Sequence, residues 1–102
     1  MNHEMAIAVV QARLLGEHAI PVKIRTRNDV TEAEIAELLA AVDYLIVHYQ
    51  DQAAVPKTLA AAFVEIYNGF VQTGGQLSDA QAQRLEAVAI ALQDRAYRLF
   101  GL

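Results

Sequence analysis

The sequence has 102 residues, no cysteine and a formal net charge of −4 at neutral pH. Its length suits a single domain over residues 1–102, and the lack of cysteine excludes disulfides and thiolate metal sites. The negative charge disfavours nucleic acid as a partner, because binding to nucleic acid depends on Lys and Arg neutralising phosphates. The unbroken apolar runs are much shorter than the roughly 20 residues of a membrane-spanning helix, and no basic segment precedes the first of them, so we expect a cytoplasmic protein without a membrane span or secretory signal.

The first predicted helix covers residues 4–18. Ile7, Val10 and Leu14 recur at spacings of three and four, which places them on one helical face. Gly16 and Pro21 are typical of a helix end. In residues 20–28 apolar and basic side chains alternate with the period of a strand, but no second alternating segment offers a pairing partner. We therefore predict an extended linker that lies on the helices.

The second predicted helix begins at Thr31. Thr31 and Glu34 have the spacing of a capping box, in which each side chain binds the other's backbone N–H. The apolar stripe that follows has the 3-4 rhythm of a helical bundle and consists of Ile35, Leu38, Val42, Leu45 and Tyr49. From Asp29 to Asp51 there are six acidic residues and no Lys or Arg. The simplest interpretation is a solvated acidic helix face beside the basic 20–28 segment.

The third predicted helix runs from Val55 and Pro56 to the Gly74-Gly75 pair, which is typical of a helix stop. Its stripe consists of Leu59, Phe63, Ile66 and Phe70. Gly69 lies inside this helix at a cost of about 1 kcal/mol relative to alanine. We expect it to allow a neighbouring helix to come close.

The fourth predicted helix opens at Ser78, with Gln81 completing a second capping box. Leu85, Val88, Leu92 and Leu99 form its stripe. Short connections between successive helices favour antiparallel neighbours. The predicted fold is therefore all-α, an antiparallel up-down four-helix bundle.

No pattern of catalytic residues stands out. His3, His18 and His48 lack the spacing of a helical metal site, and no Glu-x-x-His pair of the di-iron type occurs. We expect His48 to have a structural or surface role. The sequence predicts a protein that is not an enzyme, binds no metal and needs no cofactor, and that works by binding a partner.

The candidate partner-binding residues lie at the end of the fourth helix: Arg95, Tyr97, Arg98 and Phe100. Aromatic and arginine side chains are enriched in the residues that dominate binding energy at protein interfaces. A structural interpretation competes with this one. Phe100 and Leu102 are also suited to fill the end of the bundle, because terminal apolar residues bury themselves where they can.

The second half of the chain carries a recognisable set of residues. They are Pro56-x-x-Leu59, then Val64, Ile66, Tyr67 and Phe70, then Gln76-Leu77-Ser78-x-x-Gln81-x-x-x-Leu85, and finally Leu92. With the acidic helix before them, these residues resemble the immunity proteins of the enterocin A and pediocin-like (class IIa) bacteriocins. The resemblance covers about residues 29–99.

The resemblance implies a function. Such immunity proteins are cytoplasmic antiparallel four-helix bundles that protect a bacteriocin producer from its own antimicrobial peptide. They act at the cytoplasmic side of the peptide's membrane receptor, a sugar transporter of the mannose phosphotransferase system. Their C-terminal half selects the bacteriocin, which points on this chain to Arg95, Tyr97, Arg98 and Phe100.

The alternative is a small helical regulatory or adaptor module that binds other proteins or forms homodimers. Such a module should expose a second apolar stripe on one helix. We expect it, if present, on the fourth helix around Val88, Ala89, Ala91 and Leu92. Both interpretations are compatible with a monomer or a weak homodimer.

Overall fold

The computed structural model describes residues 1–64, 66–71 and 78–101. These residues form helices and no strand, which confirms the all-α prediction. The helices are α1 (His3–Leu14), α2 (Ile20–Arg25), α3 (Glu32–Tyr49), α4 (Lys57–Ala62), α5 (Ile66–Val71) and α6 (Asp79–Leu99). None of them has the length and apolar character needed to cross a membrane.

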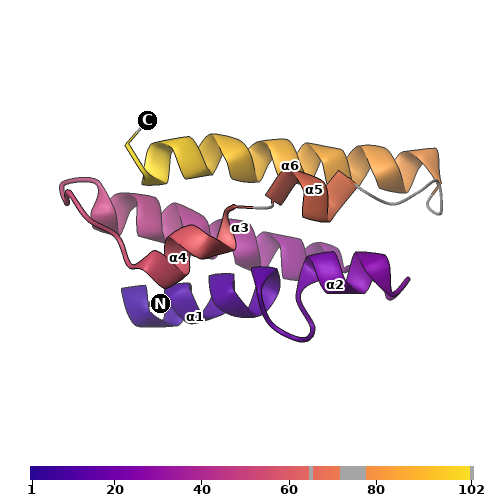
Figure 1. Ribbon diagram of the computed structural model, residues 1–102, viewed down its shortest axis with the longest axis horizontal. Coiled ribbons are helices and arrows are strands. Elements are labelled where there is room, and N and C mark those ends of the chain that lie inside the picture. The colour runs from indigo at the N-terminus through magenta and orange to yellow at the C-terminus, as the bar shows by residue number, and fades with distance from the viewer. Residues whose placement is uncertain (65, 72–77, 102) are drawn as a thin grey trace.

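The helices run back and forth along the long axis of the molecule (Figure 1). α1 and α2 lead from one end to the other, α3 returns, α4 and α5 lead out again, and α6 returns. α3 packs mainly against α1 and α6, while α4 contacts α1 and α5 contacts both α2 and α6. Helices α3 and α6 are therefore parallel neighbours, whereas the sequence led us to expect each helix beside the next one along the chain.

Two predicted segments differ from the structure. Residues 20–28 are not an extended linker, because α2 forms there with Pro21 in its first turn, where proline costs no hydrogen bond. Ile20 and Ile24 are both buried, and their spacing of four puts them on one helical face. The apparent period of two in this segment was therefore misleading. The first helix also ends at Leu14, four residues earlier than predicted.

The third predicted helix is divided into α4 and α5. α4 ends at Ala62, and the N–H of Phe63 turns back to the carbonyl of Ala60. The division allows α4 to pack on α1 and α5 to pack on α6. Gly69 fulfils its prediction, since a Cβ atom there would lie 3.2 Å from Pro21 of α2. The predicted stop at residues 74–75 lies outside the described residues.

Side chains cap the long helices. The hydroxyl of Ser78 accepts from the N–H of Gln81 at 3.2 Å, and the Gln81 amide oxygen accepts from the N–H of Ser78, so this capping box is complete. The hydroxyl of Thr31 accepts from the N–H of Glu34 at 3.1 Å. That second box stays half formed, because the Glu34 carboxylate instead accepts from Lys23 on α2 at 2.5 Å.

The acidic run of α3 holds the other helices. Ion pairs join Glu37 to Arg13 of α1 at 2.9 Å, Glu34 to Lys23 of α2, Glu32 to Arg84 of α6 at 2.7 Å, and Asp43 to Arg95 of α6 at 2.8 Å. Four of the six acids of the predicted solvated acidic face thus have basic partners on other helices; Glu32, Glu37 and Asp43 stay exposed to solvent as predicted, and only Glu34 is mostly buried. Surface pairs of this kind contribute little individually because water screens them, and together they favour one register.

Candidate binding surfaces

The predicted site at the end of α6 contains two side chains that are committed to the fold. Arg95 donates from Nε to Asp43 Oδ1 at 2.8 Å and from Nη1 to the carbonyl of Ala91 at 3.2 Å. Phe100 is half-buried, and its ring meets Phe63 edge to face with centroids 5.5 Å apart. This contact favours the structural interpretation of Phe100. Residue 102 lies outside the described residues.

The other two predicted residues face solvent. Tyr97 is 53% exposed, and Arg98 beside it is also exposed. Seven residues before Tyr97, and hence on the same helical face, Ile90 is 49% exposed. Ile90, Tyr97 and Arg98 are called the α6 surface below. Sequence reasoning missed Ile90, although its spacing from Tyr97 was a usable signal.

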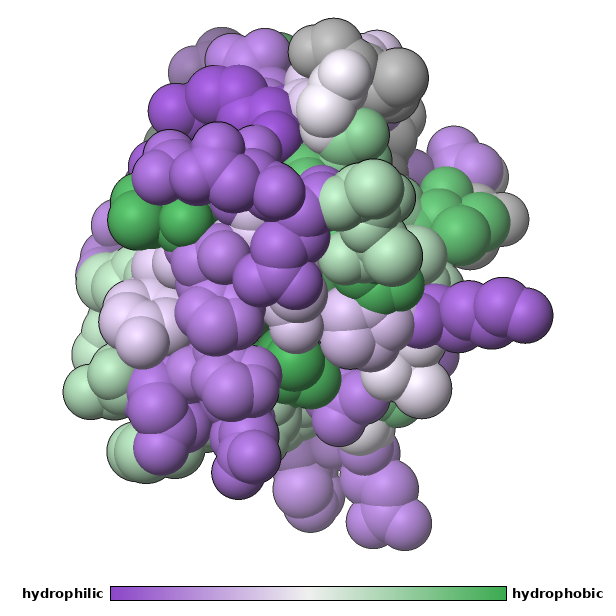
Figure 2. All heavy atoms as spheres, turned by 90° about the vertical axis from the view of Figure 1, so that its left-hand side faces the viewer, coloured by the Kyte–Doolittle hydropathy of each residue, from purple (hydrophilic) through white to green (hydrophobic). Residues whose placement is uncertain are grey.

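The end of the molecule near the C-terminus is mostly hydrophilic. Figure 2 looks onto this end and shows hydrophobic side chains only as separate spots between polar ones. A small hollow of about 120 Å³ lies here, lined in part by Tyr49, Val55, Arg98 and Phe100. It is too small to hold a substrate of ordinary size.

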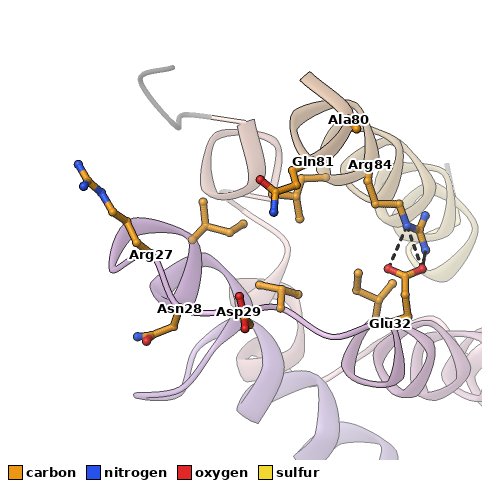
Figure 3. Close-up of a pocket in the computed structure, with 11 residues that line it drawn as sticks. Arg27, Asn28, Asp29, Glu32, Ala80, Gln81 and Arg84 are labelled. Atoms are coloured by element: carbon orange, nitrogen blue, oxygen red, sulfur yellow. Dashed lines mark hydrogen bonds and ion pairs between the residues drawn. The ribbon is translucent and has the colours of Figure 1, made fainter. Parts of the chain in front are cut away.

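A larger cavity of about 520 Å³ lies toward the opposite end, between the start of α6 and the segment that joins α2 to α3 (Figure 3). Its apolar wall consists of Ile24, Val30, Ile35, Ala80 and Leu85. Its polar rim consists of Arg27, Asn28, Asp29, Glu32, Gln81 and Arg84. The predicted site residues contribute nothing to this cavity.

Two of the charged side chains at the rim of this cavity, Glu32 and Arg84, pair with each other. Arg84 donates from both Nε and Nη2 to the Glu32 carboxylate, the nearest contact being 2.7 Å (Figure 3). These hydrogen bonds lower the pKa of Glu32 and raise that of Arg84. Because the pair closes on itself, it is suited to joining α3 and α6 rather than to transferring protons.

The histidines give no catalytic or metal arrangement within the described residues. His3 stacks on His48 with ring centroids 4.3 Å apart, and Tyr49 meets His48 edge to face. His48 thus joins the end of α3 to the start of α1. No group of three or more His, Cys, Asp or Glu side chains in the described ranges is arranged to hold a metal ion.

A second apolar stripe exists, but it is on α1 and not on α6 as predicted. Val88, Ala89 and Leu92 are buried in the core. On α1, by contrast, the face turned away from the core carries Met5, Ala8 and Ala12, and Leu15 continues it just past the helix; all four are exposed. These four residues are called the α1 stripe.

Comparisons of the chain with protein-family models, with curated proteins and with solved structures give no match.

Proposed function

We propose that this chain is a cytoplasmic bacteriocin immunity protein that counters a pediocin-like peptide by binding the peptide's membrane receptor. The receptor is a transporter of the mannose phosphotransferase type, by the resemblance described above. The protein acts by binding and carries out no chemistry. Its fold, in this proposal, is an up-down four-helix bundle whose first and third arms are interrupted, the first as α1 and α2 and the third as α4 and α5.

The observation that carries the proposal is the exposure of Ile90 and Tyr97 on one face of α6. An aromatic and an aliphatic side chain one heptad apart form a contact that a receptor helix or loop can cover. Arg98, the next residue after Tyr97, adds an exposed guanidinium at the end of α6. Arg95 and Phe100 support this surface from within, because they fasten the last turns of α6 to Asp43 and Phe63.

The mechanism follows from conformational equilibrium. A receptor engaged by the bacteriocin exchanges between a closed state and a leaking state. The α6 surface protects the cell if it binds the closed state more tightly, because only a difference in affinity shifts the two populations. To change the ratio of closed to leaking receptor from about 1:99 to about 99:1, the protein must bind the closed state roughly 10⁴-fold more tightly.

The experiment is a protection assay in a sensitive bacterium that expresses this chain and is challenged with a panel of pediocin-like peptides. The wild type should allow survival against one or a few peptides. The double variant Ile90→Ala with Tyr97→Ala should lose protection, because it removes both exposed apolar side chains of the α6 surface. It should stay folded, because neither side chain belongs to the core.

The matched control is Tyr44→Ala, which removes a partly exposed tyrosine from α3 instead. It should keep full protection. Circular dichroism should show equal helix content in all variants. Survival of cells that carry the double variant would remove the α6 surface as the site, and failure of the wild type against every peptide would argue against immunity.

A second candidate, a small helical adaptor that acts through protein-protein binding, is favoured by one specific observation. The α1 stripe leaves an apolar helix face without a described partner, as an adaptor requires. Pull-down of a defined partner that depends on Met5 and Leu15 but not on Tyr97 would favour this candidate over immunity.

A further inference from the structure

The cavity of about 520 Å³ beside the start of α6 has the size and the lining of a small-molecule site. Ligand sites in proteins commonly have volumes of about 300–1,000 Å³, a mainly apolar wall and a few polar groups. Three parts of the chain supply the apolar wall: Ile24 of α2, Val30 and Ile35 around the start of α3, and Ala80 and Leu85 of α6. Ile24, Ile35 and Leu85 belong to the core, so the fold itself holds this wall in place.

The wall is suited to an alkyl chain. Its described residues carry aliphatic side chains and no aromatic ring. Flat aromatic ligands gain most from stacking on aromatic rings, whereas an alkyl chain needs only apolar contact area. If each non-hydrogen atom of a ligand takes about the 30 Å³ of a water molecule in the liquid, about 15 such atoms would fill the cavity. An alkyl chain of about eight carbons with a polar head therefore fits inside this volume.

The charges at the rim decide which head the chain should carry. Arg84 donates to the Glu32 carboxylate from Nε at 3.1 Å and from Nη2 at 2.7 Å, so this pair has little charge to offer a ligand. Arg27 extends away from the cavity (Figure 3). The remaining rim charge is Asp29, whose carboxylate has no hydrogen bond or ion pair within residues 1–64, 66–71 and 78–101.

The helix ends beside the cavity do not reverse this preference. α3 and α6 both begin here, and the N-terminus of a helix attracts negative charge. Acidic side chains already occupy both first turns, Glu32 and Glu34 in α3 and Asp79 in α6. The chain as a whole also has a net charge of −4. The field at the cavity therefore favours a cation over an anion.

We propose that this cavity binds a small aliphatic amine, with the alkyl chain against Ile24, Ile35 and Leu85 and the ammonium group beside the Asp29 carboxylate. This inference goes beyond the proposed immunity function and does not depend on it. The cavity lies beside the start of α6, whereas the proposed receptor contact uses the second half of that helix.

The proposed contacts set the expected affinity. Octylammonium, with about nine non-hydrogen atoms, should bind with a dissociation constant of about 1 mM at an ordinary ligand efficiency. Each buried CH₂ group strengthens binding about fourfold, so butylammonium should bind at least tenfold more weakly. The contact with Asp29 is exposed to solvent and should contribute a smaller factor of about two to five.

Titration of the full chain, followed by amide NMR spectra, tests the proposal. The probes are octylammonium chloride, sodium octanoate and 1-octanol, which share one alkyl chain and differ in the charge of the head. Octylammonium should bind at least about fivefold more tightly than octanoate, because Asp29 attracts one head and repels the other. The shifted amides should lie around the cavity, at Ile24, Val30 and Leu85. Added salt should weaken the binding of octylammonium but not that of octanol.

A charge variant isolates the role of Asp29. Asp29→Asn removes the charge and keeps the shape of the side chain. It should weaken octylammonium about two- to fivefold, strengthen octanoate and leave octanol unchanged. Asp51→Asn is the matched control, because Asp51 is an exposed acid just beyond the other end of α3. It should leave the affinity for all three probes unchanged.

A cavity-filling variant tests the location. Ala80→Phe places a ring in the cavity from an exposed position of α6, so it should block all three probes without disturbing the core. Ala87→Phe makes the same change at an exposed position outside the cavity lining and should bind the probes as the wild type does. Circular dichroism confirms that each variant is folded.

Three results would overturn the proposal. They are an absence of amide shifts at the cavity with octylammonium up to about 10 mM, octanoate that binds as tightly as octylammonium, and equal affinity of octylammonium for the wild type and Asp29→Asn. Amide shifts confined to the α1 stripe, or binding that Ala80→Phe does not weaken, would equally reject the cavity as the site.

Discussion

The first and last helices, α1 and α6, both bury one apolar face, but their outer faces differ. α6 shows solvent a mainly polar face, interrupted by Ile90, Tyr97 and the small side chains of two exposed alanines, whereas the outer face of α1 is mainly apolar. For a helix with one apolar stripe, the sequence predicts which face is buried, because only that stripe can face the core. A helix with two stripes does not, because either could be the inner one.

A strongly amphipathic helix leaves little apolar surface for a partner, because its apolar side chains are used by the core. α6 has a clear inside and outside, and a partner can use only the few apolar residues that break its polar face. The outer face of α1 carries few polar side chains that a partner would have to remove from water, so this face can serve as an interface along its length. The predictions below test whether the two helices really differ in this way.

The largest effect should come from the same substitution made on an inner and on an outer stripe. Leu92 of α6 is fully buried and Leu15 of the α1 stripe is mostly exposed. Leu92→Ala should lower the free energy of unfolding by about 2–5 kcal/mol, because it removes buried methyl groups and leaves a cavity. Leu15→Ala should change it by less than about 0.5 kcal/mol. Urea denaturation of dilute protein measures both.

Dilute solution is used because any self-association would add to the apparent stability of the wild type. Equal losses for the two variants in dilute solution would show that the α1 stripe is not an outer face.

The sequence predicted best where one rule decided the outcome. The capping residues Thr31 and Ser78 both begin helices as expected, since few other residues satisfy the first free N–H groups. The all-helical class also followed from local periodicity. Segment 20–28 failed because burial of Ile20 and Ile24 against the rest of the chain outweighed a local period of two, and no local rule contains that information.

Long-range pairing was beyond the sequence for a related reason. Glu32 and Arg84 are 52 residues apart, as are Asp43 and Arg95. Nothing local distinguishes these residues from other surface charges. The same holds at the candidate site: composition suggested Arg95 and Phe100 as binding residues, whereas their partners Asp43 and Phe63 hold them in the fold.

A medium effect is expected at the helix caps. Ser78→Ala should lower the free energy of unfolding by about 1 kcal/mol, because α6 loses the hydroxyl that accepts from the N–H of Gln81. Ser78→Asp keeps an acceptor and should restore most of the lost stability.

Asn2→Ala removes the corresponding acceptor on α1, which lies 2.8 Å from the backbone nitrogen of Met5. Hydrogen exchange should show local fraying there. If Asn2→Ala lowered the free energy of global unfolding as much as Ser78→Ala does, the starts of α1 and α6 would contribute equally to the stability of the fold.

A smaller effect should separate the residues that hold the α6 surface from those that contact the partner. Arg95→Gln breaks the ion pair with Asp43, and a double-mutant cycle with Asp43→Asn should give a coupling of about 0.2–1 kcal/mol. Tyr97→Ala should leave stability within about 0.5 kcal/mol of the wild type. A coupling of zero would mean that Arg95 is available to a partner after all.

The smallest effect should appear only in acid, at the Glu32–Arg84 pair that fastens the start of α6 to α3. The hydrogen bonds from Arg84 lower the pKa of Glu32 below its ordinary value of 4.5. A carboxyl whose pKa is lower in the folded state binds protons more readily when unfolded, so its contribution to stability is full above the ordinary value. That contribution is lost as the pH falls through the lowered folded value.

Glu32→Gln cannot titrate, so the variant should be slightly less stable than the wild type near neutral pH, and the difference should shrink as the pH falls to about 3. The effect is small because Glu32 is solvent-exposed, and added salt should reduce it further. Urea denaturation across this pH range measures it, with Glu86→Gln on the exposed face of α6 as the control. A difference between wild type and Glu32→Gln that grows in acid would reverse the sign of the argument and show that the pair does not hold α6 in the way the structure indicates.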